Sequence, residues 1–244
     1  GNAVSTMTLT INPQATANAG SDATICAGTT HQLAATADNE STILWTTSGT
    51  GTFSSTTTED PIYTPSQNDI DDSSVILTLT VTSATGCINA VDQMTLTINE
   101  SPTADAGSDA TVCEGTAWTV NDATADNYLG ISWTEDGTGS ITSGSTTLTP
   151  TYTPGTGETG TVTLTLTATP NTGCTGNAVS TMTLTINPQA TANAGSDATI
   201  CAGTTHQLSA TADNESTILW TTSGTGTFSN ATTEDPIYTP TEAD

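Results

Sequence analysis

One segment of the sequence occurs three times and divides the chain into repeats. It reads ATANAGSDATICAG at residues 15–28 and 190–203, and PTADAGSDATVCEG at residues 102–115. A fixed period of this length predicts tandem domains that each begin with the same segment. Each copy carries one cysteine, and the three follow one another at steps of 87 and 88 residues: Cys26, Cys113 and Cys201.

The apolar residues predict β-strands throughout. Residues 75–82, 94–99 and 161–169 alternate strictly between apolar residues and threonine, which is the pattern of a half-buried strand. Shorter strands are expected in THQLAATA, STILWTTS, GTFSS and PIYTP, with Gly, Pro, Asn and Asp between them. No window has a helical period. The chain is therefore predicted to be all-β, and about seven short strands in each period favour an immunoglobulin-like sandwich. In the first alternating segment these side chains should face the core: Val75, Leu77, Leu79 and Val81.

Alignment of the copies predicts the domain borders. Residues 1–69 match residues 176–244 at 63 of 69 positions. Residues 14–100 and 101–188 are expected to form complete domains, called here the first and second repeats. Residues 1–13 would be the last strand of a preceding domain, and residues 189–244, the third repeat, would lack its last two strands. With short joints that each contain one proline, the domains should lie end to end as a semi-rigid rod cut from a longer repetitive polymer.

The charge of the chain excludes one class of partner. It contains 25 acidic residues and no Lys or Arg, giving a formal net charge of -25. Nucleic-acid binding depends on cations that neutralise phosphates, so no nucleic-acid partner is expected. No run of about 18 apolar residues is present either, so this segment is not expected to insert into a membrane.

Two aromatic residues recur at matching positions of each copy. A tryptophan lies in the predicted third strand, and a tyrosine lies in a repeated Tyr-Thr-Pro motif. Large aromatic side chains at such positions are typical core anchors. The predicted core residues are Trp45, Trp133 and Trp220, with Tyr63, Tyr152 and Tyr238.

The five cysteines allow two pairings. Cys26 and Cys87 are 61 residues apart, as are Cys113 and Cys174, so each pair could close its own domain; Cys201 would pair beyond residue 244. Alternatively, Cys26 bonds Cys174 of the next domain. Cys26 is expected in the turn after the first strand and Cys87 in the turn before the last, at opposite poles. A strand of about seven residues spans about 23 Å, whereas bridged Cα atoms lie about 5.5 Å apart. Both pairings remain open, and either predicts an oxidising, extracellular setting.

Metal or cofactor binding is not expected, with one alternative. Asp69, Asp71 and Asp72 cluster in a single loop, and carboxylate oxygens are ligands that Ca²⁺ prefers. Their spacing does not match an EF-hand, and the middle copy has GTGETG there. A solvated acidic loop is the simpler interpretation, so no cofactor is expected unless calcium binds at this loop.

An enzymatic function is not expected. The histidines His31 and His206 occupy one position in two copies, and the middle copy has Trp118 there. The sequence contains no G-x-S-x-G nucleophile motif.

The repeated motifs carry a resemblance to a known class of repeat. The order AxAGSDATxC, WTxxGTGxF or WTEDGTGS, YTP, LTLT and a GC pair resembles the PKD-like and Ig-like tandem repeats of very large cell-surface proteins of Bacteroidetes. The resemblance implies secretion by the type 9 route, an extracellular location at the cell surface, and a role in adhesion or gliding.

Two functions remain open. The first is a structural repeat region of a long extracellular fibre, stalk or filament-forming adhesin, whose partners are neighbouring copies of the same repeat. The alternative is an Ig-like module whose loops bind surface glycans or a protein. The middle copy differs from the others at Trp118, Tyr128 and Glu135–Asp136, which would suit a binding face or two alternating domain types.

Overall fold

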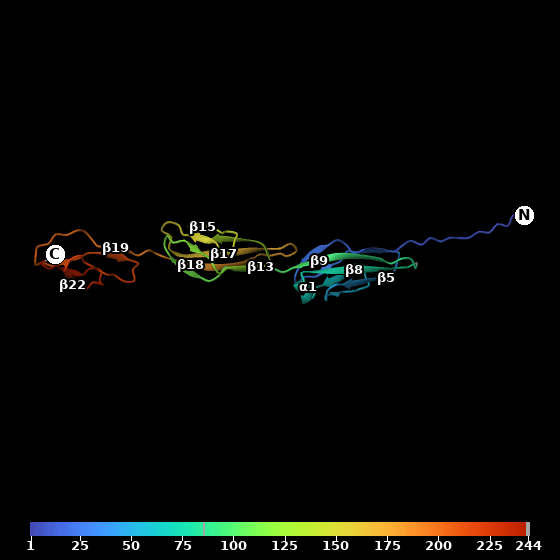
Figure 1. Cartoon of the computed structure of the whole chain (residues 1–244), viewed down its shortest axis with the longest axis horizontal. Coiled ribbons are helices and arrows are strands. Elements are labelled where there is room, and N and C mark those ends of the chain that lie inside the picture. Colours follow the sequence, from blue (N-terminus) through green and yellow to red (C-terminus); the bar gives the residue numbers. More distant parts are fainter. Residues whose placement is uncertain (85, 243–244) are drawn as a thin grey trace.

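A computed structural model describes residues 1–84 and 86–242, and the three repeats follow one another along its long axis (Figure 1). The first repeat contains one short helix among strands. Its elements are β1 (Thr16–Asn18), β2 (Ala23–Cys26), β3 (His31–Gln32), β4 (Thr36–Asp38), β5 (Glu40–Thr47), β6 (Thr52–Phe53), β7 (Ile62–Thr64), α1 (Gln67–Asp71), β8 (Ser74–Ser83) and β9 (Ala90–Asn99).

The second repeat follows the same order without the helix, and the described part of the third repeat, up to residue 242, contains fewer strands. The second has β10 (Thr103–Asp105), β11 (Ala110–Cys113), β12 (Trp118–Thr119), β13 (Thr124–Asp126), β14 (Tyr128–Glu135), β15 (Ser140–Ser143), β16 (Thr151–Thr153), β17 (Gly160–Pro170) and β18 (Ala178–Asn187). The third has β19 (Thr191–Asn193), β20 (His206–Gln207), β21 (Thr211–Asp213), β22 (Thr227–Phe228) and β23 (Ile237–Thr239).

Each complete repeat is a β-sandwich. In the first, a four-stranded sheet of order β2-β9-β8-β5 faces the sheet β3-β7-β6 and the pair β1-β4. The second repeats this arrangement as β11-β18-β17-β14, β12-β16-β15 and β10-β13. The pairings β2–β9 and β11–β18 are parallel, and the other pairings of these sheets are antiparallel. The prediction of tandem immunoglobulin-like sandwiches is confirmed.

The alternating pattern of the sequence forms the core. Along β8, Val75, Leu77, Leu79 and Val81 are buried, while the threonines between them are partly or fully exposed, as predicted. Each of the first two repeats has its own cluster of buried residues. Each sandwich therefore has the apolar interior that an independent domain needs.

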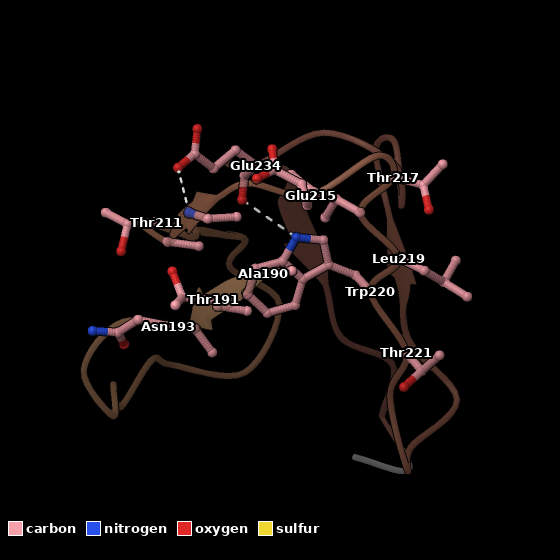
Figure 2. A pocket seen from close by; sticks show the side chains of 15 residues that line it. Ala190, Thr191, Asn193, Thr211, Glu215, Thr217, Leu219, Trp220, Thr221 and Glu234 are labelled. Atoms are coloured by element: carbon pink, nitrogen blue, oxygen red, sulfur yellow. Dashed lines mark hydrogen bonds between the residues drawn. The ribbon is translucent and has the colours of Figure 1, made fainter. Parts of the chain in front are cut away.

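The aromatic residues lie differently in the third repeat. Trp45, Tyr63, Trp133 and Tyr152 are buried in the cores of the first two repeats. Trp220 and the equivalent tyrosine Tyr238 were expected in the core but are only partly buried. The reason is topological, because β5, which carries Trp45, pairs with β8, and no strand among the described residues of the third repeat takes the place of β8 or β9. Trp220 instead lines an open pocket (Figure 2).

One expectation stays a prediction, and one element was not expected. Residues 1–13, expected as the last strand of a preceding domain, lie outside any strand at one end of the molecule (Figure 1), and that assignment is not tested by this chain. A strand needs a hydrogen-bonding neighbour, and these residues lie away from the sheets. The helix α1 was not predicted, because its five residues are too few to show a period; it begins at a capping box formed by Ser66 and Asp69.

Candidate functional site: the joint between the first two repeats

The parallel pairing of β2 with β9 places the last residues of both strands at the pole from which the chain leaves the first repeat. The register pairs Ile25 with Ile98 and Cys26 with Asn99, and the amide of Ala27 donates to the Asn99 carbonyl at 2.8 Å. Cys26 is therefore the last residue of a strand, rather than part of the turn expected from the sequence. This pairing holds the cysteine beside the point at which the chain leaves for the second repeat.

A disulfide crosses the joint. Cys26 is bonded to Cys174, whose Cα lies 4.6 Å away and which is 148 residues later in the chain. Of the two pairings that the sequence left open, the structure contains the one between repeats. Cys174 lies in the loop that connects β17 to β18, at the pole of the second repeat that faces the first.

Asparagine side chains add hydrogen bonds to the same joint. Asn99 Nδ2 donates to the Thr172 carbonyl at 2.8 Å, and Asn127 Nδ2 donates to Glu100 Oε2 at 2.7 Å. Asn171 Nδ2 in turn donates to the Asn127 carbonyl at 3.1 Å. These contacts connect β9 and the linker to two loops of the second repeat.

One asparagine position is common to all three repeats. Asn39, Asn127 and Asn214 each have a positive φ, of 59°, 56° and 59°, a conformation that asparagine tolerates better than most residues. Asn39 Nδ2 donates to the Gln14 carbonyl at 3.0 Å and Asn214 Nδ2 to the Gln189 carbonyl at 3.4 Å. Each joint thus has an asparagine that bonds the linker preceding its repeat.

A glycine allows the close approach of the two repeats. Gly173 has a φ of +85°, and a Cβ added to it would lie 2.9 Å from both the carbonyl carbon and the oxygen of Thr24. Real Cβ atoms do not come so close to backbone, so this position requires glycine. The loop carrying Cys174 therefore packs directly against the backbone of β2.

The other cysteines lie at equivalent places. Cys113 is the last residue of β11, as Cys26 is the last residue of β2. Both Cys113 and Cys201 are exposed. The Cys87 sulfur lies 3.9 Å from the carbonyl oxygen of Asn12. In the same way, the equivalent Cys174 sulfur lies 3.3 Å from the carbonyl oxygen of Asn99. The surroundings of the joint are thus reproduced at the start of the first repeat.

Replacing Gly173 by alanine should loosen the joint. Gly86 is the matched control, because it holds the same loop position in the first repeat with a φ of +72° but has nothing within 4 Å of an added Cβ. Both changes strain the backbone, but only Gly173→Ala displaces the loop from Thr24. We expect dithiothreitol to reduce the Cys26–Cys174 bond several-fold faster in Gly173→Ala, and at the wild-type rate in Gly86→Ala. Equal rates in both variants would contradict the packed joint.

The residues considered as calcium ligands do not form a site. The side chain of Asp69 is buried, whereas Asp71 and Asp72 are exposed, and Asp71 accepts a hydrogen bond from Gln67 Nε2 at 2.8 Å. Within residues 1–84 and 86–242, no group of three or more His, Cys, Asp or Glu side chains is placed to hold a metal ion. The oxygens of Asp69 are directed to hydrogen-bond donors instead.

Asp69 organises the loops around it. Its oxygens accept hydrogen bonds from the Tyr63 hydroxyl at 2.7 Å and from the amides of Thr50, Gly51 and Ser66 at 2.8, 3.0 and 3.1 Å. This contact explains why the repeated GTG motif has glycines, because a Cβ on Gly49 or Gly51 would collide with the Asp69 carboxylate.

The second repeat uses a glutamate for the same purpose. Glu158 accepts from the Tyr152 hydroxyl at 2.8 Å and from the amides of Thr138 and Gly155 at 2.6 and 2.7 Å. The sequence GTGETG, at residues 155–160, replaces the acidic loop of the first repeat. Its Glu158 nevertheless supplies the equivalent carboxylate, from a turn instead of a helix. In the third repeat, the corresponding Asp244 lies outside the described residues.

Hydrogen bonds keep these carboxylates ionised. Burial by itself raises the pKa of Asp69, but the bonds from Tyr63 and from the amides of Thr50 and Ser66 outweigh it and hold the pKa below 3.8. The same balance lowers the pKa of Glu158. Burial, together with the neighbouring carboxylates, raises the pKa of both Tyr63 and Tyr152 to about 12. The tyrosines therefore remain neutral donors.

Removing the carboxylate should destabilise the first repeat. Asp69→Ala leaves one hydroxyl and three amides without their acceptor, which costs about 1–3 kcal/mol of unfolding free energy at pH 7. Because the folded-state pKa is depressed, this contribution is present above about pH 4 and is lost as the pH falls through the folded pKa, so the difference from wild type should narrow in acid. Urea unfolding, followed by hydrogen exchange of first-repeat peptides, measures both effects. Asp72→Ala, at an exposed position, is the control, and an equal loss there would contradict this role.

The histidines occupy strand positions next to the tyrosines. His31 on β3 pairs with Tyr63, and His206 on β20 pairs with Tyr238, while Trp118 pairs with Tyr152 in the second repeat. Burial lowers the pKa of His31. The position thus pairs across the sheet with the tyrosine of each repeat, and its histidine is replaced by tryptophan in the middle copy.

The fold and the joint define a tandem array of immunoglobulin-like domains with a covalent link between neighbours. No protein-family model matches the chain, and no curated protein matches it. Among solved structures it is similar to the first four immunoglobulin domains of Sidekick-1, with 16% identity and a TM-score of 0.46 over 72% of this chain and 50% of that chain. It is also similar to three immunoglobulin domains of titin, with 8% identity and a TM-score of 0.45 over 93% of this chain and 87% of that chain. The insect immune protein hemolin matches at 13% identity and a TM-score of 0.43, over 70% of this chain and 46% of that chain.

Proposed function

We propose that the chain is a rigid spacer: a repeat region of a long extracellular fibre or stalk, which holds neighbouring domains at a fixed spacing and orientation. The observation that carries the proposal is the disulfide between Cys26 and Cys174, because it joins two domains that each have a complete core of their own. A bond that neither core requires serves to fix one domain relative to the next.

The surroundings of the bond support the same role. The close packing of Gly173 on Thr24 and the asparagine bonds to the linker restrict rotation at the joint. An adaptable binding protein would gain from mobile domains, whereas a spacer needs fixed ones. The near identity of residues 1–69 and 176–244 also fits a spacer, in which each unit has the same task.

The location follows from redox chemistry and charge. Disulfides persist in oxidising compartments, so we place this chain outside the cell. A net charge of -25 favours solubility and repulsion between neighbouring fibres. No helix in the described part of the chain has the length and apolar character needed to cross a membrane. The sequence motifs resemble the repeats of large Bacteroidetes surface proteins, and we propose the same setting, at the cell surface, for this chain.

A second candidate function rests on two residues of the second repeat. Tyr128 and Leu129 are 37% and 73% exposed, at the positions where the first repeat has Glu40 and Ser41. An exposed aromatic and apolar pair suits the binding of a glycan or a protein. Binding to a glycan array that is lost in Tyr128→Ser would favour this module over a simple spacer.

Small-angle X-ray scattering tests the spacer directly. If the joint holds the domains, the largest dimension of the particle should be unchanged between about 0.02 M and about 0.5 M salt, because charge repulsion is screened over this range while the joint is not. Reduction should broaden the distance distribution, and Cys26→Ser with Cys174→Ser should do the same under oxidising conditions. A particle that shortens with salt, and does not respond to reduction, would show that charge alone extends the chain.

A further inference from the structure

The disulfide of the joint divides the chain into a part that tension reaches and a part that it does not. Cys26 and Cys174 are 148 residues apart in sequence but directly bonded. A pull on both ends of the chain is carried by the shortest covalent path, which enters the bond at Cys26 and leaves it at Cys174. Residues 27–173 form a closed loop beside this path, and they contain most of the buried residues of both cores.

In the first repeat the path runs through residues 14–26, which lie along β9 from one pole to the other. Both β1 and β2 contact β9. The amide of Ala19 donates to the Asp92 carboxylate near the start of β9 at 2.7 Å, and Cys26 pairs with Asn99 at its end. The ten-residue strand β9 spans about 33 Å, and residues 14–26 span at most about 45 Å when fully extended. Unfolding would lengthen this segment by only about 10 Å.

In the second repeat the path runs through β18. This ten-residue strand follows Cys174 after a short loop and ends where the chain leaves the repeat. It lies between β17 and β11, and its apolar side chains Met182, Leu184 and Ile186 are buried. A strand gains almost no length on unfolding, because its rise of about 3.4 Å per residue is close to the limit of the chain. Both repeats are therefore crossed by segments that are already extended.

The length gained on unfolding decides how strongly tension favours the unfolded state, because the work done is the force multiplied by that gain. Without the disulfide, tension would draw out all of residues 14–99, and unfolding the first repeat would gain about 250 Å. With the disulfide, the gain falls to about 10 Å, so a given tension does roughly 25-fold less work on this repeat.

We propose that the joint makes this region a tension-bearing tether. A pull along the fibre passes through residues 14–26, the Cys26–Cys174 bond and β18, while residues 27–173 stay folded and unloaded. The fibre then sustains tension without exposing its apolar cores. This role goes beyond the spacer function, because a chain that bends freely at the joint would be protected in the same way.

With the bond reduced, the pairing of β2 with β9 still resists a pull. Tension then draws β2 toward the start pole and β9 toward the exit pole. Because the two strands are parallel, they are pulled past each other along their length, and the hydrogen bonds between them are stretched together. The hydrogen bond from the Thr95 amide to the Asp22 carboxylate, at 2.7 Å, is stretched with them. A reduced repeat should therefore unfold in a single large step.

Optical tweezers test the load path on the 244-residue chain, held by peptide tags at its two ends so that no cysteine is needed for attachment. In the reduced chain we expect steps of about 250 Å from the first and second repeats, and no such step in the oxidised chain. The reduced chain should also reach a final length greater by about 500 Å, the extended length of the 148 bypassed residues. Cys174→Ser should behave like the reduced chain without any reductant. Cys113→Ser, at an exposed cysteine outside the bond, is the matched control and should behave like the oxidised wild type.

Equal final lengths with and without reductant would overturn the proposal, as would steps of about 250 Å in the oxidised chain. Scattering separates this outcome from a failure of the spacer function, because it reports the stiffness of the joint in the absence of tension. If scattering shows a flexible chain while the oxidised chain stays short under tension, only the spacer is wrong. If scattering shows a rod whose extended length does not respond to reductant, only the load path is wrong.

Discussion

The parallel pairing of an early strand with the last strand is the interaction on which the rest of the structure depends. It brings the end of an early strand beside the end of the last strand at the exit pole of each complete sandwich, as in the pairs β2–β9 and β11–β18. Because the chain leaves the first repeat beside Cys26, the next domain begins within reach of that cysteine. A sandwich whose last strand ended at the other pole could not place a disulfide across its exit.

The absence of Lys and Arg from the sequence imposes a second constraint. A buried carboxylate is commonly paired with a cation, and this chain has none from lysine or arginine. Asp69 and Glu158 are satisfied instead by a tyrosine hydroxyl and backbone amides. The glycines of the GTG motif provide the space, so a motif that resembles flexible linker sequence is a closely packed part of the core.

Much of this architecture could be predicted from the sequence, because period-two alternation and exact repetition are strong signals. The strands around Val75 and Thr161 and the sandwich class follow from them. The disulfide pairing did not follow, since equal spacing within each copy fits two connectivities. The role of Asp69 was also hidden, because a buried hydrogen-bonded carboxylate and a calcium ligand look alike in sequence. The helix α1 and the exposure of Trp220 depend on tertiary neighbours that no local pattern records.

Peptide mapping without reduction tests the central claim, a covalent joint between domains, most directly. Trypsin has no site in a chain without Lys and Arg, and pepsin in acid also suppresses thiol exchange, which requires a thiolate. The account predicts a peptide pair that links Cys26 to Cys174. Recovery of Cys26 linked to Cys87 would contradict it, because the bond would then lie within one domain and leave the joint to weak contacts alone.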